Sequence, residues 1–186
     1  MTSHENSVWT ISPADGELLL HTGVAGRAAR MGHRLTIAMT RWHATVSWSD
    51  SRPVGAELVV ETESFEVLRG DGGVKGLSGA EKAVVRSNAL KSLSASRFPE
   101  IRYTAGVIEE AGDGYRLSGT LAIRGKSRDH VIEVRTEDLG GSWRMSVEST
   151  IRQSDYGIKP YSLLMGSVQV ADEVALTFSA VRAQDN

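Results

Sequence analysis

The side chains best suited to catalysis or metal binding are the 5 histidines, and they are widely scattered. His4, His21, His33, His43 and His130 include no pair at i,i+2 or i,i+4, the spacings that bring two metal ligands together on a strand or a helix. The chain has 0 cysteines, which excludes thiolate ligands, cysteine nucleophiles and disulfides. A metal site would need side chains that converge from separate strands, so we expect neither a metal ion nor another cofactor.

Motifs for nucleophilic catalysis and phosphate binding are also absent from the sequence. No serine lies in a G-x-S-x-G elbow. The glycine-rich segment 70–79, "GDGGVKGLSG", lacks the Gly-Lys-Ser/Thr ending of a P-loop and the glycine spacing of a dinucleotide-binding turn, so we interpret it as a flexible connector. We therefore expect a protein that is not an enzyme. The alternative is a hydrolase or metalloenzyme that uses His21, His33 or His43 inside the fold.

A local basic cluster is formed by Arg27, Arg30, His33 and Arg34 between two expected strands. Loops in this position commonly surround the mouth of a barrel. One hypothesis is that these side chains hold an anionic or polar head group through charge-assisted hydrogen bonds. The other is that they form an exposed basic turn with no ligand.

Length, charge and hydropathy narrow the class of protein. A chain of 186 residues fits one domain, which buries roughly 70% of its unfolded surface. A net charge of -2 provides no field that would steer the chain onto nucleic acid, so we expect no nucleic-acid partner. Residues 1–10, "MTSHENSVWT", lack the features of a secretory signal, and we expect a cytoplasmic protein. Because no apolar run approaches the ~20 residues that span a bilayer, we expect no membrane insertion.

Period-two alternation of apolar and polar residues is the dominant structural signal. In "YRLSGTLAIR", residues 115–124, the large apolar side chains all fall on odd positions. Strands with one polar face, separated by glycine-containing turns at 112–114, 125–127 and 140–141, indicate antiparallel sheet. The candidates amount to about eight strands, the number at which a barrel encloses side chains or one small ligand.

Two helical segments and one irregularity interrupt the strands. Ser78 lies three residues before Glu81, the spacing of a capping box, and predicts a helix from about Gly79 to Leu93. A short helical turn is expected near 25–32. The apolar positions change from odd to even near residues 40–41, which predicts a β-bulge there.

Several small residues share the parity of the large apolar ones in their strands, namely Ala105, Gly119, Ser149 and Ala180. If these faces point inward, the interior is underfilled, and an empty space lined by apolar residues suits an apolar ligand. The alternative is that the helix or the tryptophan side chains fill the space.

Several short motifs follow one another in a specific order. "RFPEIRY" is followed by "YRLSGTLAIRG" and "HVIEV", and later by "IRQSDYGIKPYSLLMGSVQVADEVALTF". "VWTISP" and the "GH-x-L" pattern of Gly32 to Leu35 precede them. This order of motifs, from about Trp9 to Arg182, resembles the YceI-like family of polyisoprenoid-binding proteins. It implies a mainly β fold, a single antiparallel eight-stranded lipocalin-like barrel with one capping α-helix. Residues 1–8 would be a flexible N-terminus, 9–183 the barrel domain and 184–186 a tail.

The resemblance also implies which residues meet a ligand. Inward-facing side chains would line the lumen: Leu35, Ile37, Leu58, Val60, Tyr103, Leu117, Leu121, Trp143, Met145 and Phe178. A second group would contact a head group or shape the rim: Arg27, Arg30, His33, Arg34, Arg152, Asp155, Tyr156 and Tyr161. For Arg152 and Asp155, an ion pair that holds a loop is an equally good explanation.

The implied function is binding or carriage of a long apolar molecule, such as a polyisoprenoid or a fatty acid or amide, without catalysis. Some relatives form dimers, which leaves a homodimer open. Besides the histidine-dependent enzyme, a further alternative is a protein–protein interaction module whose barrel is packed solid.

Overall fold

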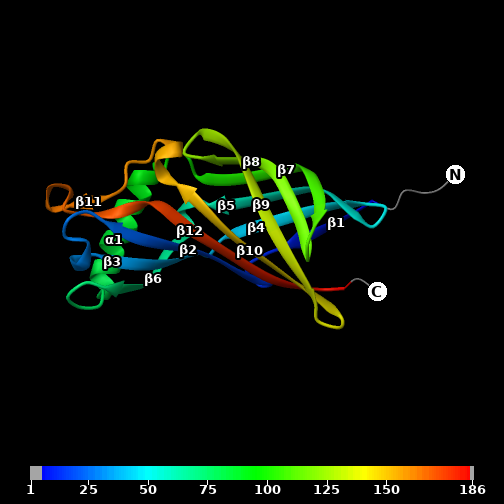
Figure 1. Ribbon diagram of the computed structural model, residues 1–186, viewed down its shortest axis with the longest axis horizontal. Helices are drawn as coiled ribbons and strands as arrows, with labels where there is room; N and C mark the ends of the chain where they lie inside the picture. Colours follow the sequence, from blue (N-terminus) through cyan, green and yellow to red (C-terminus); the bar gives the residue numbers. More distant parts are fainter. Residues whose placement is uncertain (1–5, 185–186) are drawn as a thin grey trace.

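A computed structural model describes residues 6–184 of the chain and contains one curled sheet and one long helix (Figure 1). The helix α1 (Gly79–Leu93) lies between the sixth and seventh strands in sequence. The strands are β1 (Asn6–Ile11), β2 (Gly16–Ala25), β3 (His33–Met39), β4 (Trp42–Ser49), β5 (Arg52–Glu61), β6 (Phe65–Gly72), β7 (Glu100–Ala111), β8 (Gly114–Ile123), β9 (Lys126–Asp138), β10 (Ser142–Arg152), β11 (Ser162–Leu163) and β12 (Val168–Ala183).

All strand pairings are antiparallel, in the order β1-β4-β5-β7-β8-β9-β10-β12-β2-β3-β6, with β11 beside β12. β3 and β4 follow each other in the chain but lie near opposite ends of this order, and so do β5 and β6. The short connections from β3 to β4 and from β5 to β6 therefore bring the two ends of the sheet together, and the sheet curls into a barrel. Within residues 6–184, counting each interrupted pair as one strand gives the predicted eight long strands, and the short β1 and β11 are additional.

The bulge predicted near residues 40–41 is instead a break between two strands, β3 and β4. A second break, between β5 and β6, lies opposite it. The backbone N–H of Thr40 donates to the carbonyl of Ser64 at 3.2 Å across the break. Thr62, which is 1% exposed, donates its N–H to the carbonyl of Pro99 at 2.8 Å and its hydroxyl to that of Phe98 at 3.0 Å. The segment that leads into β7 thus satisfies the polar groups freed where the two strands bend.

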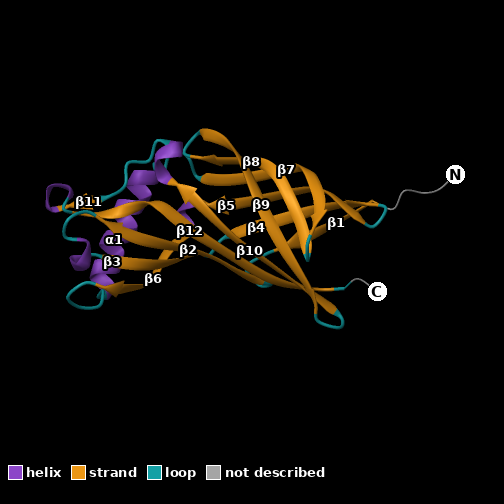
Figure 2. Ribbon diagram, viewed as in Figure 1, coloured by secondary structure: helices purple, strands orange, loops and turns teal. Residues whose placement is uncertain are grey.

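Both helical predictions are confirmed. α1 begins with a complete capping box, in which Ser78 Oγ accepts from the Glu81 N–H at 3.2 Å and Glu81 Oε2 accepts from the Ser78 N–H at 2.7 Å. It ends at Ser94, which adopts the left-handed conformation of a C-cap. The predicted turn is a single 3-10 turn over Ala29–Met31. All described helical segments gather toward one end of the barrel, whereas the other end consists of strands and hairpins (Figure 2).

At the strand-only end, β12 contacts β1. Arg182 Nη1 donates to the carbonyl of Thr10 at 3.1 Å, and its guanidinium lies 5.1 Å from the ring centre of Trp9. β1 begins at Asn6, so residues 6–8 of the predicted flexible N-terminus pair with β4 instead, while residues 1–5 lie outside the described part. No helix among the described residues is long and apolar enough to cross a membrane.

Candidate ligand-binding site in the barrel lumen

The barrel encloses an elongated cavity of about 710 Å³, within the ~300–1,000 Å³ range of small-molecule sites. Its wall is mostly aliphatic and is contributed by nearly every strand, because one face of each strand carries the large apolar residues. The residues expected to line it do so, except for Trp143: Leu35, Ile37, Leu58, Val60, Tyr103, Leu117, Leu121, Met145 and Phe178.

Trp143 lies on the face of β10 shared by Met145 and Val147, but it is not part of the cavity wall. It pairs with Asp138, next to the turn that joins β9 to β10, and is only half-buried. The β9–β10 hairpin projects from the strand-only end of the barrel (Figure 1). Parity therefore predicted the correct face of the strand but not how far along it the lumen reaches.

The small inward-facing residues that were expected to leave empty space account for little of the cavity. A Cβ built on Gly119 would clash with the backbone carbonyl oxygen of Thr104 and would lie 2.9 Å from Cζ of Tyr103, so the backbone of β7 and the tyrosine ring leave no room for a side chain. Ala105 and Ala180 are buried and do not line the cavity, whereas Ser149 does.

The helix forms part of the wall and does not fill the barrel. Val85, Ala89 and Leu93, spaced at i, i+4 and i+8, face the cavity together with Asn88 and Ser92. Sequence reasoning missed this face because the two polar residues interrupt the apolar stripe. It also missed Met31, Leu163 and Leu164, which line the cavity and are at the same time exposed on the surface.

A small polar group interrupts the apolar wall. Nε2 of His130 lies 2.8 Å from Oγ of Ser149, and the single O–H of Tyr103 is shared between the carbonyls of Leu117 and His130, each 3.1 Å from the hydroxyl oxygen. Burial lowers the pKa of His130, and burial also raises the pKa of Tyr103 to about 12. Both side chains are therefore held uncharged at neutral pH, so this group can offer hydrogen bonds to a ligand without the cost of a buried charge.

The residues expected at the rim occupy three kinds of position. His33 and Tyr161 line the cavity, and Nε2 of His33 donates to the carbonyl of Lys75 at 2.6 Å. Tyr156 is buried beside Tyr103 and packs inside the wall, where burial raises its pKa. The others are exposed and lie outside the cavity wall: Arg27, Arg30, Arg34, Arg152 and Asp155. Within residues 6–184, Arg152 and Asp155 form no ion pair with each other.

The histidines considered for catalysis do not converge on one site, because each lies in a different environment. His21 bonds the hydroxyl of Thr177 at 3.2 Å, and His43 is exposed on β4. Of the histidines in residues 6–184, only His33 and His130 line the lumen. Within residues 6–184, no group of three or more metal-ligating side chains converges.

Comparison with known proteins agrees with this architecture. A family model described as the YceI-like domain matches residues 9–182. The crystal structure of Burkholderia cenocepacia BcnA is similar, with a TM-score of 0.69 and 18% identity over 92% of this chain and 98% of that one. The YCEI protein of Campylobacter jejuni is similar with a TM-score of 0.54 and 12% identity over 100% of this chain and 88% of that one. No curated protein matches the chain.

Proposed function

The chain belongs to the YceI-like family, and from this we propose that it binds a long apolar molecule in the barrel lumen and releases it unchanged. The observation that carries the proposal is the cavity of about 710 Å³ with its mostly aliphatic wall. A cavity of this kind has too few polar partners to hold many waters in place, and it suits hydrocarbon.

The energetics of such binding require few specific contacts. Each methylene group moved from water into the lumen contributes about 0.8 kcal/mol. Ten of them would favour binding by about 8 kcal/mol before the entropy of association is subtracted. This term does not distinguish an isoprenoid from a fatty chain. The group formed by His130 and Ser149 would add selectivity for ligands that carry a hydroxyl, carbonyl or amide at the matching position.

The alternative functions have less support from the geometry. A histidine-dependent enzyme requires a base beside a nucleophile or a metal. His21 and His43 lie outside the cavity wall, and within residues 6–184 no carboxylate is hydrogen-bonded to the His130–Ser149 pair. A solid barrel acting as an interaction module is disfavoured by the size of the lumen. We accordingly propose a non-catalytic protein, with the cytoplasm as its predicted location.

Native mass spectrometry of protein purified without detergent, combined with analysis of its organic extract, tests the proposed function. We expect either a co-purified apolar molecule at one per chain or an empty protein that takes up an added long-chain isoprenoid alcohol at one per chain. Binding of neither isoprenoids nor fatty acids by the folded protein would refute the proposal, and a stoichiometric metal ion would favour the histidine-dependent enzyme.

A further inference from the structure

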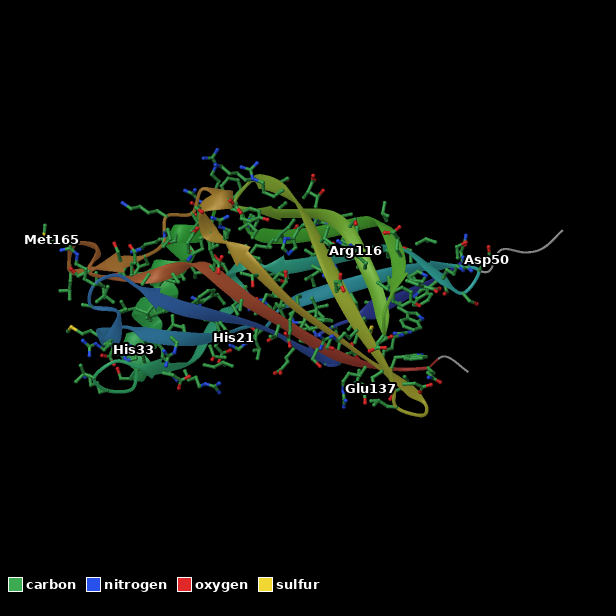
Figure 3. All side chains as sticks on the ribbon, in the orientation of Figure 1. His21, His33, Asp50, Arg116, Glu137 and Met165 are labelled. Atoms are coloured by element: carbon green, nitrogen blue, oxygen red, sulfur yellow. The ribbon has the colours of Figure 1, made fainter. Side chains whose placement is uncertain are left out.

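Three loops meet at the open end of the lumen, and we call them the mouth lip: residues 26–32, 73–77 and 161–167. The first and third are joined by a hydrogen bond from the N–H of Ala28 to the carbonyl of Ser167 at 2.8 Å. The second is tied to the start of β3 by the bond from His33 to the Lys75 carbonyl. The lip thus forms one connected surface, at the end of the molecule where Met165 and His33 are labelled (Figure 3).

Large apolar side chains on the lip point into solvent. Val74 is 87% exposed, Leu164 62%, Met31 55% and Leu163 53%, and Met165 is fully exposed. Exposed apolar groups that lie singly on a surface are ordinary, but several concentrated on adjoining loops indicate an interaction site.

The backbone of the third loop holds these side chains outward. Leu164 and Met165 have φ values of 51° and 56°, in the left-handed region that side chains with a Cβ rarely adopt. Two successive residues of this kind cost free energy, and such conformations concentrate at functional sites. Leu164 also lines the cavity, so the tip of this loop connects the lumen wall with the outer surface.

The lip and its flanks are positively charged although the whole chain has a net charge of -2. Residues 26–34, 72–78 and 157–170 contain Arg27, Arg30, Arg34, Lys75 and Lys159 and no aspartate or glutamate, and the neighbouring Asp71, which lies across from Arg34 in the sheet, leaves the excess positive. Among these cations, only Lys75 forms an ion pair within residues 6–184, at 3.8 Å to Glu81. Acidic residues such as Asp50 and Glu137 lie toward the opposite end (Figure 3).

We propose that the mouth lip docks on an anionic lipid surface. Apolar tips that enter the boundary between head groups and acyl chains, surrounded by arginines that contact lipid phosphates, are the combination by which peripheral proteins bind such surfaces. A second copy of the chain fits less well, because the same positive charge would face itself in a symmetric dimer. Docking in this orientation places the opening of the lumen against the bilayer. An apolar ligand could then pass between lipid and lumen without crossing water, a consequence that rests on the proposed function.

Vesicle co-sedimentation tests the docking. The native chain is expected to bind vesicles of equimolar phosphatidylcholine and phosphatidylglycerol, to bind pure phosphatidylcholine vesicles much more weakly, and to lose affinity at about 0.5 M salt. The pair Arg27→Gln and Arg30→Gln is expected to weaken binding by about 25-fold. The pair Val74→Ser and Met165→Asn is expected to weaken it at least about tenfold, and asparagine tolerates the left-handed backbone at position 165.

Matched controls alter exposed residues elsewhere. The pair Val107→Thr and Val131→Thr removes exposed apolar surface from the outside of the sheet, and Arg116→Gln removes an exposed charge distant from the lip (Figure 3). Both controls are expected to bind vesicles like the native chain. Equal binding by the lip variants and the native chain, or no binding of anionic vesicles, would overturn the proposal. So would a native dimer that the Val74→Ser, Met165→Asn variant converts to monomers, because the lip would then be a contact between copies.

A separate measurement distinguishes failure of docking from failure of the proposed function. Neither Val74 nor Met165 lines the cavity, so the variant that carries both changes is expected to take up a fluorescent fatty acid in vesicle-free buffer as the native chain does. Vesicle binding without any uptake would refute lumen binding and leave docking supported. Uptake without vesicle binding would leave the lumen proposal supported and refute docking.

Discussion

The substitution Ala89→Phe is expected to shorten the longest chain that the lumen accepts. Ala89 lies on the face of α1 that lines the cavity, and a phenylalanine there would add six carbon atoms to the lumen. If a methylene takes about the 30 Å³ that a water molecule occupies in the liquid, the cavity of about 710 Å³ holds roughly 24 of them. The variant would therefore hold about six fewer.

The assay is displacement of a fluorescent fatty acid by a series of unbranched alcohols of increasing length. For the native chain, each added methylene should tighten binding about fourfold, since about 0.8 kcal/mol is gained per group. The gain should end near 20 to 24 carbons, when the lumen is full. For the Ala89→Phe variant, the same slope should end about six carbons earlier.

The control is Ala83→Phe, the same change on the same helix at an exposed position. Both variants carry a similar cost in helix propensity, below about 1 kcal/mol, so a difference between them reports on the lumen. Identical chain-length profiles for the two variants would refute the assignment of the binding site to this cavity. An affinity that does not depend on chain length would refute the hydrophobic account of binding.

Three further predictions concern the elements that build the site. Ser78→Ala removes the capping box of α1 and should lower the free energy of unfolding by about 1 kcal/mol in urea titrations, whereas Ser78→Thr should retain most of it. Thr62→Val leaves the Phe98 carbonyl without its side-chain donor and should cost about 1–3 kcal/mol, while Thr62→Ser should cost less; equal losses would contradict the hydrogen-bond explanation. Burial lowers the pKa of His130, so the unfolded chain binds more protons, and Tm should fall as the pH drops from about 7 through the lowered value. A His130→Gln variant should show a weaker fall over that range, and an unchanged dependence would assign the effect to other groups.

Much of the fold could be predicted from the sequence because local rules agree with the tertiary structure. The capping spacing of Ser78 and Glu81 predicted where α1 begins, and the predicted range Gly79–Leu93 is the observed one. Alternation predicted which face of each strand points inward, since a side chain in a strand has only two directions to choose from. Most of the predicted lumen residues follow from that choice alone.

The remainder depends on distances that alternation does not encode. Trp143 has the inward parity but lies past the end of the cavity, beside the β9–β10 turn. Gly119 suggested empty space, which the backbone of the neighbouring strand β7 and the ring of Tyr103 occupy. The contribution of α1 to the cavity wall was missed because the polar residues Asn88 and Ser92 lie on its inward face. Each error concerns how elements approach one another in three dimensions, whereas the assignment of the elements themselves was sound.

The most direct test of the central claim is photo-crosslinking with a long-chain fatty acid that carries a diazirine near its end, followed by peptide mapping of the adducts. We predict adducts on inward-facing residues such as Leu117, Leu121 and Met145, and competition by an unlabelled long-chain alcohol. Adducts confined to exposed apolar residues of the outer sheet surface, such as Val107 and Val131, would contradict lumen binding.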